Sequence, residues 1–65
     1  MIVLHRLNDT PFVLNAELIR TVEEKPDTVI TLINGDHLVV KESMSDVVDR
    51  SVEYGRRLRY LIPPS

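Results

Sequence analysis

Length and composition exclude several classes of protein before any motif is considered. The chain has 65 residues, enough for one domain spanning 1–65, and a single core of that size supplies only about 3–5 kcal/mol of stability. It contains no cysteine, which excludes disulfides and thiolate zinc sites. Its formal net charge of −2 lacks the positive excess that is typical of a general polyanion binder. Because so small a core needs reinforcement, we expect a homo-oligomer.

Apolar segments are too short to indicate a membrane protein. None approaches the roughly 20 residues that a bilayer span needs. The apolar run at the N-terminus is much shorter than the apolar part of a signal peptide. We therefore expect a cytoplasmic protein without a membrane span, which could still associate with a membrane protein.

Alternating apolar residues and turn residues predict five short β-strands. The expected strands span residues 2–7, 12–15, 19–24, 29–33 and 36–41. Between the second and third strands, Asn15 is expected to cap a 3₁₀ turn at most. The Asn34-Gly35 pair predicts a two-residue type I′ hairpin turn, because both central positions of that turn need a positive φ.

From Ser43 onward the apolar period changes from two residues to three or four, which predicts a helix over residues 44–61. Ser43 or Ser45 is the expected N-cap. An apolar stripe follows one face of this helix, and charged residues follow the opposite face. Acidic residues come early and arginines late, as the helix dipole favours.

These elements predict an α+β fold, mainly β: a five-stranded antiparallel meander followed by one C-terminal amphipathic helix. The strand at 29–33 is apolar on both faces, and one helix covers only one face of a sheet. We therefore expect an oligomer interface formed by apolar strand residues and by the helix stripe, in which Gly55 would allow close approach of two backbones. The predicted interface residues are Val29, Ile30, Leu32, Val39, Val48, Val52 and Gly55.

No constellation of residues predicts catalysis, a cofactor or a metal site, so we expect a protein that is not an enzyme. The serines at 43 and 45 have a capping role, and His5 and His37 lie on separate strands. Near the C-terminus, Arg56, Arg57 and Arg59 lie within four positions. They suit the helix dipole and solubility, and they are also the best candidates for binding an acidic partner surface.

Taken in order, several segments resemble one known family over nearly the whole chain. These are "LHRLND", "PFVLNAELI" and "PDTVITLINGDHLVVKES", with a Tyr-x-Arg-Arg sequence after them. They resemble the FlbD/SwrD family of small flagellar (swarming motility) proteins. One departure is Asp9, where the family usually has glycine, and it bears on the first turn because Asp adopts a positive φ less readily.

This resemblance implies a non-enzymatic accessory of the bacterial flagellum, located in the cytoplasm or at the inner-membrane face of the flagellar base. It implies binding to motor, stator or basal-body proteins and a role in the power of swimming or swarming. The family has no established catalytic residue to carry over to this chain.

An alternative comes from the start of the chain. "MIVLHR", short strands and a C-terminal helix also resemble the CsrA family of RNA-binding post-transcriptional regulators. Leu4 and Arg6 would match the first RNA-contacting strand of that family. The second RNA-contacting segment should fall near 40–45, where "VKESMS" lacks its arginine, and the acidic net charge makes nucleic-acid binding the less favoured hypothesis.

Overall fold

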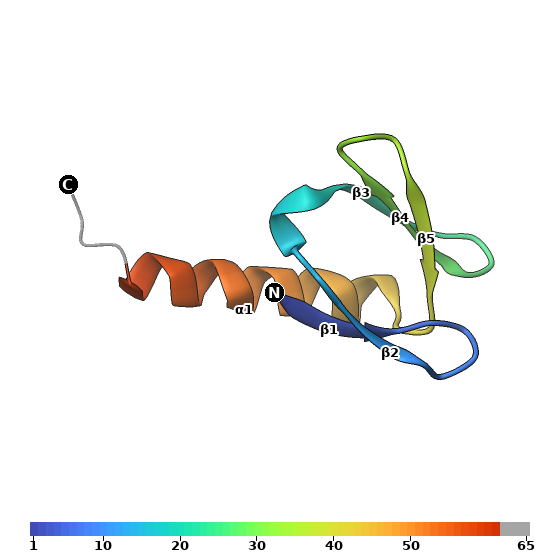
Figure 1. Ribbon diagram of the computed structural model, residues 1–65, viewed down its shortest axis with the longest axis horizontal. Coiled ribbons are helices and arrows are strands. Elements are labelled where there is room, and N and C mark those ends of the chain that lie inside the picture. The colour runs from blue at the N-terminus through green and yellow to red at the C-terminus, as the bar shows by residue number, and fades with distance from the viewer. Residues whose placement is uncertain (62–65) are drawn as a thin grey trace.

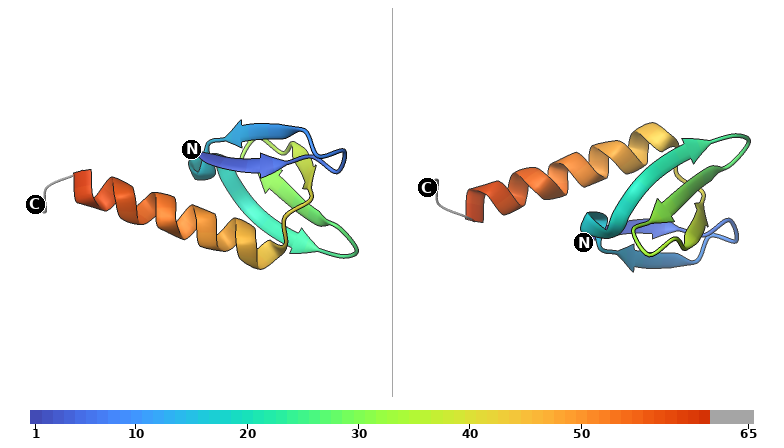
Figure 2. Two further views of the ribbon diagram at one scale, coloured as in Figure 1. Left: turned by 90° about the horizontal axis from the view of Figure 1, so that it is seen from below. Right: turned by 90° about the horizontal axis from the view of Figure 1, so that it is seen from above.

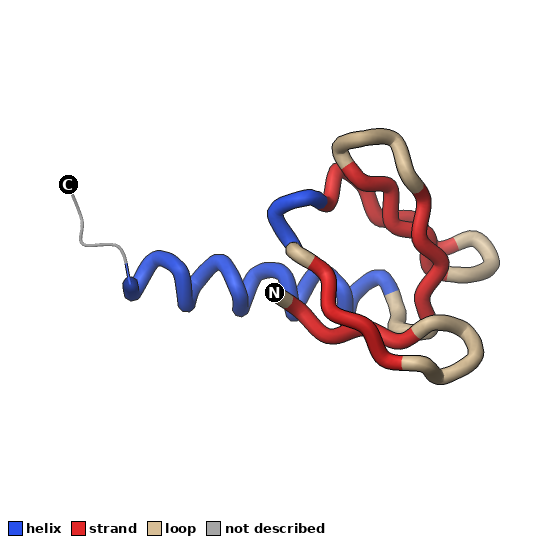
Figure 3. Tube along the Cα trace, in the orientation of Figure 1, coloured by secondary structure: helices blue, strands red, loops and turns tan. Residues whose placement is uncertain are grey.

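A computed structural model describes the backbone of residues 1–61 and the side chains of residues 1–56 (Figure 1). It confirms the α+β fold, mainly β, with five antiparallel strands and one C-terminal helix (Figure 3). The elements are β1 (Ile2–His5), β2 (Pro11–Leu14), the 3₁₀ turn η1 (Ala16–Leu18), β3 (Ile19–Glu24), β4 (Thr28–Leu32), β5 (His37–Val40) and α1 (Met44–Leu61).

The strands form two sheets, β1-β2 and β3-β4-β5, where the sequence predicted one continuous meander. The separation occurs at η1, where the side chain of Asn15 accepts a hydrogen bond from the backbone N–H of Glu17 at 3.1 Å. This capped turn changes the direction of the chain between β2 and β3, so that these consecutive strands do not pair. Figure 2 shows the two sheets side by side, with α1 running along the junction between them.

Four fully buried aliphatic side chains form the centre of the core, and each comes from a different element. They are Leu4 in β1, Ile30 in β4, Val40 in β5 and Val47 in α1. Each such side chain stabilises the fold by about 1.5–3 kcal/mol relative to an exposed one. The core therefore joins both sheets and the helix, although it is small.

Both β1-β2 and β4-β5 are connected by the same kind of three-residue loop. In the first loop, the N–H of Asp9 donates to the carbonyl of Arg6 at 2.9 Å and the N–H of Arg6 donates to the carbonyl of Thr10 at 2.9 Å. The second loop, from Leu32 to Asp36, repeats both bonds at 2.9 and 2.8 Å. This is a type I turn followed by one residue with positive φ.

The predicted type I′ turn at Asn34-Gly35 is therefore wrong. Only Gly35 has a positive φ, 93°, and Asn34 instead accepts a hydrogen bond from the N–H of Asp36 at 3.0 Å. The loop begins at Ile33 because its N–H donates to the carbonyl of Leu18, 2.9 Å away, and not to β5. The strand ladder consequently ends one residue earlier than the apolar run suggested.

Asp9 occupies in the first loop the position that Gly35 occupies in the second, with φ of 71°. Its carboxylate forms an ion pair with the ammonium group of Lys41. The hydrogen bond and positive charge of Lys41 hold the pKa of Asp9 below its usual value. The aspartate that departs from the family pattern thus adopts the backbone conformation of a glycine and adds a contact to the segment after β5.

The helix begins where the sequence predicted, at Met44 after the cap residue Ser43. The Ser43 hydroxyl accepts a hydrogen bond from the N–H of Asp46 at 3.2 Å, and Glu24 accepts one from the N–H of Met44 at 2.6 Å. Figure 1 shows that only the first part of α1 lies against the strands, and the rest projects beyond them.

The two matched loops allow a direct test of their left-handed positions. Gly35→Ala should lower the free energy of unfolding by about 1 kcal/mol, since a side chain at positive φ costs about that much, and no atom within 4 Å opposes the added methyl group. Asp9→Gly should show no comparable loss, because relief of the same strain offsets the loss of the Lys41 ion pair. In a Lys41→Gln background, Asp9→Gly should be stabilising. Urea unfolding measures all four variants, and equal losses in both loops would contradict this account.

Candidate functional site

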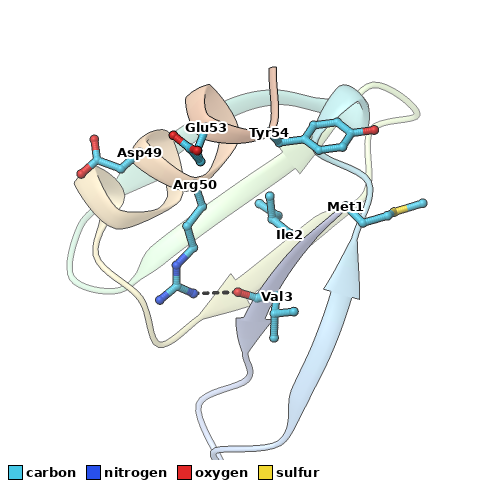
Figure 4. Close-up of a pocket in the computed structure, with 7 residues that line it drawn as sticks. All are labelled: Met1, Ile2, Val3, Asp49, Arg50, Glu53 and Tyr54. Carbon is cyan, nitrogen blue, oxygen red and sulfur yellow. Dashed lines mark hydrogen bonds between the residues drawn. The ribbon is translucent and has the colours of Figure 1, made fainter. Parts of the chain in front are cut away.

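An open groove runs between β1 and α1, with a volume of about 460 Å³ (Figure 4). Its strand wall is apolar, whereas its helix wall carries two acids, an arginine and a tyrosine. The lining residues are Met1, Ile2, Val3, Asp49, Arg50, Glu53 and Tyr54.

A hydrogen-bond network centred on Glu42, in the short segment between β5 and α1, connects the two walls of the groove. One oxygen of its carboxylate accepts a hydrogen bond from the backbone N–H of His5 at 2.8 Å. The other oxygen lies 2.6 Å from Nδ1 of His5 and 3.2 Å from the guanidinium group of Arg50. Arg50 also donates to the carbonyl of Val3 at 2.6 Å, as the dashed line in Figure 4 shows.

These bonds cover the edge of β1 that faces away from β2. An uncovered strand edge is a template for pairing with another chain. Here the carboxylate of Glu42 and the guanidinium of Arg50 take the positions of partner backbone groups, and the N–H of Lys41 donates to the carbonyl of His5 at 2.8 Å. The network therefore attaches the two-stranded sheet to both the helix and the segment after β5.

The Glu42 carboxylate is held in its charged form despite being only 8% exposed. Burial alone raises its pKa, but hydrogen bonds from the side chain and backbone of His5, from its own backbone and from Arg50 outweigh burial and lower the pKa to about 2, from an ordinary value of 4.5. The site thus contains a buried anion that is satisfied from several sides.

Beside the groove, the outer face of β1-β2 exposes apolar side chains. Val3 and Val13 lie directly opposite each other in the register of the two strands, and they are 52% and 63% exposed. Ile2, Leu4 and Leu14 point to the opposite face and are buried. This small sheet is therefore apolar on both faces, and the core covers only one of them.

The predicted interface residues do not all lie on the surface. Ile30 is fully buried in the core of the single chain, so it must be removed from the predicted set. This happens because β4 is the central strand of its sheet and its Ile30 face receives the side chains of β1 and α1. Val39, Val48 and Val52 are exposed, whereas Val29, Leu32 and Gly55 are partly exposed. The structure does not gather these six residues into a single patch.

Of the three predicted partner-binding arginines, Arg56 is exposed. Arg57 and Arg59 lie outside the described side chains. His5 belongs to the Glu42 network, and His37 lies on the other sheet, 3.0 Å from the hydroxyl of Thr31. Among the residues that the structure describes, no group of three or more His, Asp or Glu side chains is placed to hold a metal ion, and no helix is long and apolar enough to cross a membrane.

Sequence reasoning missed Glu42, Arg50 and Val3 as members of a site. Each has a local explanation: Glu42 lies in the short segment between β5 and α1, Arg50 lies on a charged helix face, and Val3 alternates within β1. These residues come together through contacts between positions that are 37 and 47 residues apart in the sequence. Local sequence patterns do not indicate contacts of that separation.

The class of protein that emerges is a small α+β domain with a projecting helix, whose surface features are grooves and apolar faces. Residues 1–59 match the family model FlbD, described as flagellar and swarming motility proteins, so the chain belongs to the FlbD family. This confirms the resemblance noted in its sequence. Searches of curated proteins and of solved structures find no match.

The Glu42 network predicts a specific sensitivity to acid. Because the pKa of Glu42 is lower in the folded chain than in the unfolded chain, the unfolded chain takes up a proton first as pH falls. The stability that the carboxylate contributes is complete above about pH 4.5 and should be lost progressively toward pH 2. Glu42→Gln should lower the free energy of unfolding at neutral pH by about 2 kcal/mol. The free energy of unfolding of this variant should also fall less steeply than that of wild type between pH 4.5 and pH 2. Urea unfolding across pH measures both effects. The exposed Glu23→Gln serves as the control. If the free energy of unfolding of Glu42→Gln falls toward pH 2 as steeply as that of wild type, the acid sensitivity does not come from Glu42.

Gly55 offers a second test, since no atom lies within 4 Å of an added Cβ. Within a single chain nothing requires glycine there, so Gly55→Ala should stabilise the helix by about 1 kcal/mol. Thermal unfolding of a dilute sample measures this. If Gly55→Ala instead lowers the stability of the dilute sample, another part of the same chain must contact Gly55, which would contradict the structure.

Proposed function

We propose that this protein is a non-enzymatic accessory of the flagellar motor that acts by binding a motor or stator protein. Membership of the FlbD family supports the flagellar context. The groove beside β1 supports binding as the mode of action, because it combines an apolar wall with a small number of charged groups and an aromatic side chain. We further propose that the protein acts in the cytoplasm, at the inner-membrane face of the flagellar base.

The docking surface in this proposal consists of the groove and the adjoining exposed valines, Val3 and Val13. Tyr54 and Arg50 contribute the residue types that most often dominate binding energy at protein interfaces. The Glu42 network attaches the two-stranded sheet to the helix, so that both walls of the groove are connected. Arg56, Arg57 and Arg59 remain a second predicted contact for an acidic partner.

The alternative of CsrA-like RNA binding requires Leu4 and Arg6 to face a nucleic acid. Leu4 is fully buried in the core, and the guanidinium of Arg6 lies over the ring of Phe12, 4.9 Å from its centroid. The burial of Leu4 disfavours this alternative, whereas Arg6 is exposed.

A deletion strain tests the proposed function directly. Cells without the gene should assemble flagella but swim more slowly than wild type as the viscosity of the medium rises, because a weaker motor fails first under load.

A wild-type copy should restore speed, whereas Val3→Asp should not, since it places a charge on the docking surface. Ile33→Asp, at a position that is 61% exposed in the β4-β5 loop, is the matched control and should restore speed. Normal motility combined with tight binding to a GGA-containing hairpin RNA that is lost in Arg6→Ala would overturn the proposal.

A further inference from the structure

A row of exposed apolar side chains follows α1 on the side away from the β1 groove. Met44, Val48 and Val52 are 43%, 46% and 48% exposed and are spaced four residues apart. Gly55 continues the row three residues later, and no atom lies within 4 Å of where its Cβ would be. Spacings of four and three residues keep one face of a helix in line, as in the contact seam of paired helices. We call these four residues the apolar strip.

The strip continues onto the body of the protein across a second groove, of about 290 Å³. Val48, Ser51 and Val52 form its helix wall, and Ala16, Ile19 and Val22 form the wall contributed by η1 and β3. The exposed surface on this side is therefore apolar over more than one row of residues. The two grooves lie on opposite flanks of α1, because one is bounded by β1 and the other by β3.

Charges beside the strip indicate what covers it. Asp49 and Arg56 are exposed and lie two helical turns apart, on the same flank of the strip. Neither forms an ion pair with another side chain among residues 1–56. This acid and this base lie on the same flank, one on each side of Val52 in the sequence. A second copy of this surface running in the reverse direction therefore places each acid beside a base.

We propose that a second copy of this chain covers the strip, with the two α1 helices antiparallel across a two-fold axis near Val52. In such a pair, like flanks of the two helices face each other. Val48 of each copy then lies opposite Gly55 of the other, where the missing side chain leaves room for the valine. Asp49 of each copy lies beside Arg56 of the other, which gives two equivalent ion pairs.

A parallel pair does not produce this match. It would oppose the flank of Asp49 and Arg56 to the flank of Ser51 and Val47, which packs against the sheets. It would also place Val48 against Val48 and leave the two Gly55 positions facing each other. Charge complementarity therefore selects the antiparallel arrangement.

This inference does not depend on the proposed motor function, because the apolar strip lies on the other flank of α1; Asp49 alone belongs both to the lining of the β1 groove and to the proposed ion pair. It assigns Arg56, one of the three arginines predicted to bind a partner, to the contact between copies. A dimer formed this way would present two β1 grooves, one on each copy.

The first experiment compares two valines of similar exposure, Val52 and Val3. Sedimentation equilibrium over a concentration series should show a dimer for wild type. Val52→Asp should be monomeric, and Val3→Asp should remain dimeric, although it is the variant expected to fail in the motility assay. Circular dichroism should confirm that both variants are folded. A monomeric wild type, or a dimer that survives in folded Val52→Asp, would overturn the inference. A dimeric Val3→Asp with normal motility would instead contradict the motor docking surface alone.

The second experiment tests the direction of the helices by charge reversal. Asp49→Arg or Arg56→Asp alone should weaken dimerisation by about tenfold, because two symmetry-related exposed ion pairs become two like-charge contacts. The double variant Asp49→Arg with Arg56→Asp should recover wild-type affinity. Failure of the double variant to recover would exclude this pairing.

Cysteine cross-linking provides an independent measure of direction, since the natural chain has no cysteine. Val52→Cys should oxidise to a disulfide-linked dimer. A mixture of Val48→Cys and Gly55→Cys chains should form mainly the mixed disulfide, whereas a parallel pair would link each variant to itself. Asp46→Cys, on the opposite side of the helix, is the control that should remain uncross-linked.

Discussion

The arrangement of this protein depends on the buried carboxylate of Glu42. A two-stranded sheet has too few contacts to be stable by itself, and β1-β2 shares no strand ladder with the rest of the chain. Glu42 supplies the connection, because its two oxygens bind the edge of β1 and the guanidinium of Arg50 on α1. The small apolar core reinforces this connection but does not by itself determine the angle between β1 and the helix.

The position of Glu42 between β5 and α1 explains why the helix has a groove on each side. The carboxylate and Arg50 hold α1 beside β1, while Val47 packs between the sheets. The helix therefore contacts the body along a narrow line, and both of its flanks remain accessible. One flank carries the mixed polar and apolar groove that we propose for motor binding, and the other carries the apolar strip that we propose for self-association. The two proposed contacts use separate surfaces because the helix lies against both sheets and covers neither sheet completely.

Local features of the structure were predictable from the sequence. The strands, the caps of Asn15 and Ser43 and the helix over residues 44–61 depend on residues that are near each other in the chain. The division into two sheets was not predictable, because it depends on whether β2 pairs with β3. The alternation of apolar and polar residues along a strand does not indicate which other strand pairs with it. The hairpin turn at Gly35 was assigned to the wrong type because Ile33 binds Leu18, which is distant in sequence.

The candidate site shows the same limit. Val48 and Val52 were identified from the helical period, and they are exposed as an interface requires. Ile30 was assigned to the interface because its strand is apolar on both faces, but the face of β4 that carries Ile30 is the one covered by the core. Glu42 and Arg50 were not identified, since an ion pair across the fold leaves no periodic signal.

The two matched hairpin loops have a consequence for how the two sheets respond to their surroundings. Gly35 adopts its backbone conformation through the lack of a side chain, which no solution condition alters. Asp9 adopts the same conformation with a solvent-exposed ion pair to Lys41, and such a pair weakens as the salt concentration rises. The β1-β2 loop is thus held in part by an exposed ion pair whose strength varies with the salt concentration, whereas the left-handed position of the β4-β5 loop needs no charge.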